Sequence, residues 1–211
     1  DALPICLSGL KDVQLASLSS TRVNELSSAQ LSVLSTDQIK SLSTSVIANL
    51  TSGKLNTLDA SAFTALTSNQ VKALTTTQLN ALKEDQLQGI GVDDISAIST
   101  AVLSAIDKDK LILLSGDQVG ALSSAQLAAI DDADYAAMTS IQLNGLKNSQ
   151  IQTLGTAKIA ALTSDQVGVL TASQVSVLNS AQAVALTTDS TELSKLTADQ
   201  VKALSTSRSE E

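Results

Sequence analysis

The chain has 211 residues, a formal net charge of −8 at pH 7 and no histidine. Apolar residues make up 43% of it but aromatic residues only 1%, which favours a thin aliphatic core over a wide globular one. The acidic balance disfavours nucleic acids and anionic membrane surfaces as partners, because both attract basic patches. Without histidine, catalytic triads and metal sites built on imidazole are excluded.

Residues 1–9 are predicted to form an irregular lead-in, which contains the only proline, Pro4, and the only cysteine, Cys6. A single cysteine excludes a disulfide within the chain. We interpret Cys6 as a small buried apolar side chain, with an intermolecular disulfide as the alternative. Because the first residue is Asp1, we expect a processed chain or an excised segment.

From residue 10 to residue 204 the chain repeats a unit of eight residues, an octad. The octad Thr163–Leu170 reads Thr-Ser-Asp-Gln-Val-Gly-Val-Leu, and its residues define positions 1 to 8. A threonine or serine at position 1 can cap a helix, and a glutamine at position 4 can accept a hydrogen bond from the position 1 N–H, as in a capping box. The apolar residues at positions 5 and 8 lie three apart and therefore share one helix face.

The octad pattern is nearly complete. Position 8 is aliphatic or methionine in every octad from Leu10 to Leu186. Position 5 includes both aromatic residues, Phe63 and Tyr135, which we therefore predict to lie in the core. Position 1 holds a good N-cap at Ser19, Ser27, Ser35, Ser43, Thr51, Asp59, Thr67, Thr75, Ser99, Asp107, Ser115, Ser123, Asp131, Thr139, Thr163, Thr171, Asn179 and Thr187. Gly91 and Gly155 are acceptable caps, whereas Lys11, Lys83 and Lys147 predict weak helix starts.

The pattern is interrupted once. Leu186 and Leu196 are ten residues apart, which indicates a two-residue insertion within Thr188–Glu192. The octad then resumes through Leu204, and Ser205–Glu211 is expected to be a frayed polar tail.

A period of eight residues decides the fold class. Eight residues advance an α-helix by about 80° beyond two full turns, so the apolar positions of one long helix would spiral around it. A heptad coiled coil is excluded for the same reason, and a β-solenoid would need alternation with a period of two. The sequence therefore predicts an all-α solenoid of very short helices, one per eight-residue repeat. We expect helices of about five or six residues, corners of one or two, and about three or four repeats per coil.

Candidate sites are few. The acidic groups that could offer oxygen ligands to calcium are Asp93-Asp94, Asp107 with Asp109, and Asp131-Asp132 with Asp134. None has the spacing of an EF-hand, and Asp107 and Asp131 stand at cap positions, so we interpret all of them as caps and solvated residues. Lys108 and Lys110 are expected on a solvated face. We therefore predict no catalytic, cofactor-binding or metal-binding residues.

The tandem Thr-x-x-Gln-Val/Ile-x-Ala-Leu units resemble the low-complexity repeat arrays of some large secreted or surface proteins of proteobacteria. The resemblance covers nearly the whole chain and implies an extracellular or cell-surface location, with a spacer, adhesin or matrix role. We therefore expect a non-catalytic spacer or display module of a larger protein, and no membrane insertion. A protein- or glycan-binding adhesion module is the alternative, and an ice-binding surface of Ser and Thr hydroxyls is a minor one.

Overall fold

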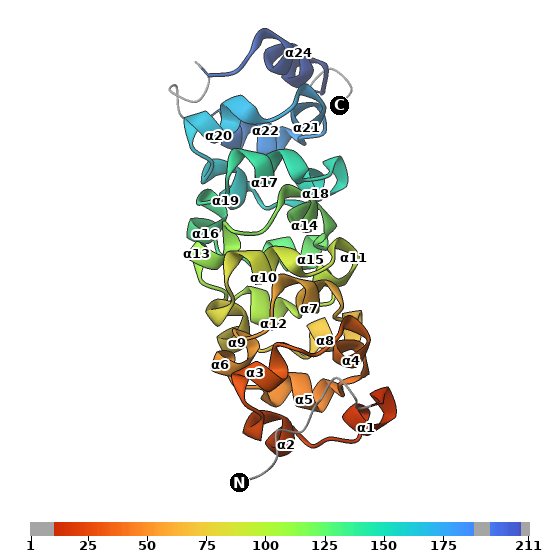
Figure 1. Cartoon of the computed structure of the whole chain (residues 1–211). Coiled ribbons are helices and arrows are strands. Elements are labelled where there is room, and N and C mark those ends of the chain that lie inside the picture. Colours follow the sequence, from red (N-terminus) through yellow and green to blue (C-terminus); the bar gives the residue numbers. More distant parts are fainter. Residues whose placement is uncertain (1–10, 188–194, 208–211) are drawn as a thin grey trace. The chain divides into compact units, whose positions relative to one another are not determined.

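A computed structural model describes residues 11–187 and 195–207. The predicted lead-in with Cys6, the insertion at Thr188–Glu192 and the last residues of the predicted tail lie outside the described part. The chain divides into two compact units, residues 1–106 and 107–211. Within the described residues every regular element is an α-helix (Figure 1), which confirms the predicted all-α class.

The helices follow one another at octad spacing. In unit 1 they are α1 (Asp12–Ala16), α2 (Ser20–Glu25), α3 (Ser28–Leu31), α4 (Thr36–Ser41), α5 (Thr44–Asn49), α6 (Ser52–Leu55), α7 (Ala60–Thr64), α8 (Ser68–Lys72), α9 (Thr76–Ala81), α10 (Glu84–Gly89), α11 (Val92–Ile95) and α12 (Thr100–Leu103). In unit 2 they are α13 (Lys108–Leu111), α14 (Gly116–Ala121), α15 (Ser124–Ala129), α16 (Asp132–Ala136), α17 (Ser140–Gly145), α18 (Asn148–Thr153), α19 (Thr156–Ala160), α20 (Ser164–Val169), α21 (Ala172–Ser176), α22 (Ser180–Leu186) and α24 (Ala198–Ser207).

The predicted start signal begins these helices. In α20 the Gln166 N–H donates to Thr163 Oγ1 at 3.3 Å, and the Thr163 N–H donates to Gln166 Oε1 at 2.8 Å. The helix ends at Leu170, which is extended at φ −59° and ψ 139°, and the next cap, Thr171, is extended as well. No described residue has a positive φ. Two extended residues thus make the corner, and no left-handed glycine is needed.

Lys83 and Lys147 make no side-chain cap hydrogen bond, as predicted. Helices still begin after them, because the lysine N–H donates to the position 4 glutamine, at 3.0 and 2.6 Å. One expectation about helix ends was wrong. At the other end of the chain, α24 continues through Ser207, into the segment predicted as a frayed tail. Ser205 occupies position 1, but Arg208 stands where a position 4 glutamine would complete a new start signal.

Helices that are three apart in order pack against one another within each unit. Figure 1 shows α9 beside α6 in unit 1, and α17 packs on α14 in unit 2. Side-chain bonds between coils commonly join residues 25 to 31 apart, as from Asn24 to Asn49 (25) and from Gln78 to Leu50 (28) and Ile47 (31). One coil therefore takes about 28 residues, or three and a half octads. The value confirms the predicted three or four octads per coil, although it is not a whole number.

Positions 5 and 8 form the core. Phe63 and Tyr135, both at position 5, are 1% and 0% exposed, which confirms the prediction that they are core residues. Position 8 is buried from Leu42 to Leu186, whereas Leu18, Leu26 and Leu34 in the first described coil are half-buried. The side chain at position 8 is thus buried by contact with the preceding coil.

Some helix pairs approach closely through small residues at position 2 of one helix and position 7 of the helix three further on. The pairs are Ala60 with Gly89 and Gly116 with Gly145. Ala172 and Ala203 occupy the equivalent positions of α21 and α24, two helices that also pack together. A Cβ atom added to Gly89 would lie 2.8 Å from the Ala60 carbonyl oxygen, and one added to Gly145 would overlap the Gly116 carbonyl oxygen. Ala60, Gly116 and Ala172 follow at intervals of 56 residues, which is two coils.

Gly145→Ala is expected to destabilise unit 2 by about 1–3 kcal/mol, because the backbone of α14 or α17 must move to admit the methyl group. The matched control is Gly53→Ala, where an added Cβ has no neighbour within 4 Å. Because Gly53 lies inside helix α6, alanine should stabilise there by about 0.5–1 kcal/mol. Urea denaturation followed by circular dichroism measures both, and equal shifts of one sign would contradict the close helix approach.

Thr163→Ala is expected to cost about 0.5–2 kcal/mol, because it removes the acceptor for the Gln166 N–H. Thr163→Ser keeps the hydroxyl and should retain nearly all of the stability. Thermal denaturation of the two variants distinguishes the stability contributed by the cap hydrogen bond from the stability contributed by packing of the methyl group. A loss in the serine variant as large as in the alanine variant would contradict the cap assignment.

Candidate functional site

The dominant polar arrangement is a series of buried glutamines between successive coils. Each occupies position 4, and its Nε2 donates to backbone carbonyls of the helix four earlier. Gln142, for example, is 1% exposed and donates to the carbonyl oxygens of Leu111 at 2.7 Å and Leu114 at 2.8 Å. We call this set the glutamine ladder, and it comprises Gln70, Gln78, Gln86, Gln142, Gln150, Gln166, Gln174, Gln182 and Gln200.

Each ladder amide is used twice. Its Oε1 accepts the N–H of its own position 1 residue, as in Gln142 with Thr139 at 2.9 Å. Its Nε2 donates to carbonyls at the end of another helix, and the position 5 carbonyl among them also accepts a backbone N–H, as Leu111 does from Leu114 at 3.2 Å. Glutamine can do both because it carries an acceptor and two donors, whereas an ionised glutamate only accepts. The ladder therefore starts one helix and closes another helix a coil away.

Lysine replaces glutamine at position 4 of three octads, as Lys54, Lys110 and Lys158, and brings a donor of its own. Lys54 Nζ donates to the Leu26 carbonyl, and Lys158 Nζ donates to the Ile130 carbonyl, both 28 residues earlier. Lysine cannot accept the position 1 N–H. In the Lys54 octad, Asn24 Oδ1 accepts the Thr51 N–H at 3.1 Å instead.

The sequence held one signal for this second role of glutamine, which the capping-box interpretation missed. A capping box accepts glutamate as readily as glutamine, yet position 4 is never glutamate between Leu10 and Leu186. At Gln200 the partners are Val167 and Leu170, 33 and 30 residues earlier. Val167 and Leu170 hold octad positions 5 and 8, as Leu111 and Leu114 do for Gln142. The sequence separations are larger by two because of the two extra residues between Leu186 and Leu196.

The predicted acidic residues have different roles in the structure. Asp131 caps α16, since the Asp134 N–H donates to its Oδ1 at 2.7 Å. Asp107 stands at the N-cap of α13, but its carboxylate makes no cap hydrogen bond, so that prediction was wrong. Asp107 begins a four-residue helix, where the Lys110 N–H donates to the Asp107 backbone carbonyl at 2.8 Å. Asp94 accepts a hydrogen bond from Ser68 Oγ, 26 residues earlier.

The remaining charged residues lie mainly at the surface. Asp93, Asp109 and Lys108 are exposed, as expected for a solvated face, while Lys110 is half-buried. Among residues 11–187 and 195–207, no group of three or more Asp, Glu, Cys or His side chains is arranged to hold a metal ion. No helix in this part of the chain has the length and apolar character needed to cross a membrane.

Asp134 occupies position 4, where most octads have glutamine. Burial raises the pKa of its carboxyl above the usual range, and Asp131 and Asp107 raise it further while Lys108 opposes them. Asp59 shows the opposite effect, because hydrogen bonds from Ser61 Oγ and the Ala62 N–H lower the pKa of its carboxyl.

Asp134→Asn is expected to raise the melting temperature at neutral pH and to lose that advantage below about pH 4, where carboxyls are protonated. The reason is that a raised folded-state pKa gives a stability contribution present at low pH and lost as pH rises through that pKa. Asp59→Asn is the matched control with the reverse trend, because its lowered pKa stabilises the fold only above the ordinary carboxyl pKa. The melting temperatures of both variants are measured between pH 2.5 and pH 7, about the span over which carboxyls titrate. The same pH dependence in both variants would contradict this prediction.

Tyr135 and Lys158 form a buried polar pair in unit 2. Lys158 Nζ lies 5.5 Å from the centre of the Tyr135 ring and 3.1 Å from Asp132 Oδ1. The Tyr135 hydroxyl is buried without a hydrogen-bond partner, and burial raises its pKa. Lys158 is only 6% exposed, whereas the side chain of Asp132 is 54% exposed, so the pair is buried on one side and reaches solvent at Asp132.

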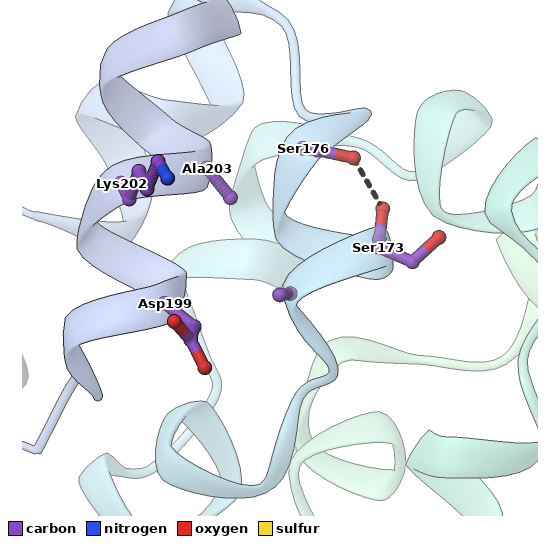
Figure 2. A pocket seen from close by; sticks show the side chains of 6 residues that line it. Ser173, Ser176, Asp199, Lys202 and Ala203 are labelled. Carbon is purple, nitrogen blue, oxygen red and sulfur yellow. Dashed lines mark hydrogen bonds between the residues drawn. The ribbon is translucent and has the colours of Figure 1, made fainter.

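A groove opens between α21 and α24 in unit 2 (Figure 2). Its volume is about 410 Å³, and it is lined by Ala172, Ser173, Ser176, Asp199, Lys202 and Ala203. Ser176 Oγ donates to the Ser173 carbonyl at 2.8 Å, and Asn148 Nδ2 donates to Ser173 Oγ at 2.8 Å. The groove offers hydroxyls, one carboxylate and one ammonium group, but no imidazole to activate a serine. The sequence interpretation did not single this groove out.

Comparison with known proteins identifies the repeat. The ALTTAQ repeat family matches residues 10–44, 136–172 and 146–180, so repeats of this type occur in several copies and in both units. No curated protein matches the chain. Among solved structures, the leucine-rich repeat-containing protein LegL7 from Legionella pneumophila is similar over 97% of this chain and 89% of its own, at 13% identity and a TM-score of 0.24.

Proposed function

We propose that the chain is a non-catalytic structural module, which spaces or displays other parts of a larger extracellular or cell-surface protein. The observation that carries this proposal is the glutamine ladder. The most regularly placed polar side chains are buried between coils, as with Gln86 at 0% and Gln118 at 1% exposure, so they stabilise the array itself. The extracellular location is supported by the resemblance of the repeat style, and labelling of intact source cells with an antibody to the chain tests it.

A spacer must lengthen when coils are added. In a repeat array each unit contacts only its neighbours, so added repeats extend it without changing its cross-section. The test is small-angle X-ray scattering of the whole chain and of a variant with residues 107–162, seven octads, duplicated in tandem. We expect a radius of gyration well above the roughly 17 Å of a compact protein of this length, and a longer maximum dimension at unchanged cross-section in the variant. A compact profile for both would refute the spacer role.

A protein-binding module is the second candidate, favoured by the open groove between α21 and α24. A glycan is a poorer partner, because carbohydrate sites commonly use aromatic side chains as apolar lining and both aromatic residues of this chain, Phe63 and Tyr135, are buried. A photo-crosslinking residue at Ser176 would test the groove in the full-length protein on source cells. A product abolished by Lys202→Ala, and missing when the probe stands at exposed Ser61, would favour binding over spacing.

Ice binding remains the minor alternative. It needs an ordered array of free hydroxyls, whereas position 1 hydroxyls are engaged as caps, as in Ser115 with the Gln118 N–H at 3.1 Å. We therefore expect no thermal hysteresis from the purified chain. A measurable hysteresis would overturn this ranking.

A further inference from the structure

The sequence contains a single Asn-Gly pair, Asn144-Gly145. The pair holds positions 6 and 7 of its octad, at the end of α17. The side chain of Asn144 is exposed, and Gly145 is half-buried. Asparagine followed by glycine is especially prone to deamidation, because glycine has no side chain to keep its backbone nitrogen away from the asparagine Cγ atom. Whether the pair reacts therefore depends on what the fold allows its backbone to do.

Gly145 is also where α17 comes closest to α14. A Cβ atom added to Gly145 would overlap the Gly116 carbonyl oxygen, and one added to Gly120 would overlap the Gly145 carbonyl oxygen. The two helices thus meet backbone to backbone at three glycines, all of them in unit 2. Such a contact has no flexible side chain that could absorb a change in the path of the chain.

The folded state opposes deamidation. Within an α-helix each backbone N–H donates to the carbonyl four residues earlier, so the Gly145 nitrogen is held in the backbone of α17 and cannot turn toward Asn144 Cγ. Gly145 is the last residue of α17, and the next N–H, of Leu146, donates to the Leu143 carbonyl at 3.2 Å. Helix ends open more readily than helix centres. Besides these hydrogen bonds, packing on α14 is what keeps the last turn of α17 folded.

We propose that Asn144 is a deamidation site whose reaction is controlled by the packing of α17 on α14. When the end of α17 opens, the Gly145 nitrogen attacks Asn144 Cγ, the Cγ–Nδ2 bond breaks, and ammonia leaves with the proton of the Gly145 amide. Water then opens the resulting succinimide ring at one of its two carbonyls. Attack at the side-chain carbonyl gives aspartate, and attack at the backbone carbonyl gives isoaspartate.

The two products have different consequences for the fold. Aspartate keeps the original backbone and adds a negative charge at an exposed position. Isoaspartate instead leads the backbone through the Cβ and Cγ atoms of residue 144, which lengthens the chain by one carbon just before Gly145. Because Gly145 meets Gly116 and Gly120 backbone to backbone, we expect the lengthened chain to lose this contact. Isoaspartate formation thus makes a transient opening permanent, whichever function the array serves.

The first test measures deamidation by mass spectrometry of the peptide around residue 144, after incubation of the whole chain at mildly alkaline pH. We expect the folded chain to react at least about tenfold more slowly than the chain unfolded in urea, because only the opened state reacts. Equal rates in both states would overturn the control by the fold. An unfolded chain that does not react at Asn144 would overturn the site itself.

The second test loosens the helix contact. Gly120→Ala places a methyl group against the Gly145 carbonyl and should speed deamidation of the folded chain by about threefold or more. The matched control is Leu178→Ala, which leaves a cavity in a later octad of unit 2, where Leu178 is 3% exposed. An acceleration by the control as large as that by Gly120→Ala would show that general unfolding exposes Asn144, and would refute control by the α14 contact.

The third test compares the two products and needs no change at the helix contact. Freshly purified Asn144→Asp carries the charge on a normal backbone and should melt close to the unaltered chain, because residue 144 is exposed. The isoaspartate fraction of the aged chain should melt clearly lower, whereas Asn144→Gln aged in the same way should keep its melting temperature. An isoaspartate form as stable as Asn144→Asp would contradict the predicted loss of the glycine contact.

Discussion

Gln142→Glu is expected to destabilise unit 2 by about 3–5 kcal/mol, because it places an unpaired buried carboxylate against two carbonyl oxygens. The affected contacts are those of Gln142 Nε2 with the Leu111 and Leu114 carbonyls. The matched control is Gln14→Glu, where the same octad position is exposed and glutamate can still accept the Lys11 N–H. Chemical denaturation at pH 7 measures both, and similar small losses would contradict the donor role of the ladder.

Two further measurements identify the cause of that loss. The cost of Gln142→Glu should shrink as pH falls, because burial raises the pKa of a carboxyl and the protonated form regains one donor. Gln142→Lys should cost less than Gln142→Glu, because Lys54 and Lys158 fill the same position in the native chain and donate to the equivalent carbonyls. A lysine variant as unstable as the glutamate variant would point to packing volume as the cause.

Leu122→Ala is expected to cost about 2–5 kcal/mol, since it leaves a cavity in a tightly packed core. Leu122 occupies position 8 and is 2% exposed. Leu18→Ala is the control, because Leu18 holds the same octad position but is only half-buried, and its loss should be clearly smaller. Negligible losses at both Leu122 and Thr163 would refute the octad as the unit of the fold.

The fold class could be predicted because each octad contains its own instructions. Thr163 starts a helix, Val167 and Leu170 define its buried face, and the next cap ends it, so local interactions suffice to specify short helices. The number of octads per coil could not be derived, because no residue within an octad sets the angle between successive helices. A signal for the coil size lies at longer range along the sequence. Small residues at position 2, such as Gly116 and Ala172, recur after 56 residues, which is two coils.

The glutamine ladder could be predicted only in part. The acceptor half of Gln166 lies three residues from its partner and belongs to a known motif, whereas its donor half contacts Ala136 and Met138, 30 and 28 residues away. The error at Asp107 has a similar origin. A cap residue was inferred from type and position alone, while the carboxylate of Asp107 makes no cap bond in the fold.

The most direct test of the coil arrangement is nuclear magnetic resonance of the glutamine side-chain amides. The Nε2 protons of Gln142 and Gln174 should exchange slowly with solvent, because both side chains are buried. They should also show nuclear Overhauser contacts to residues 28 and 31 positions earlier, Leu114 and Leu111 for Gln142, and Leu146 and Leu143 for Gln174. Rapid exchange of these protons, or contacts displaced by a whole octad, would contradict a coil of three and a half octads held by the ladder.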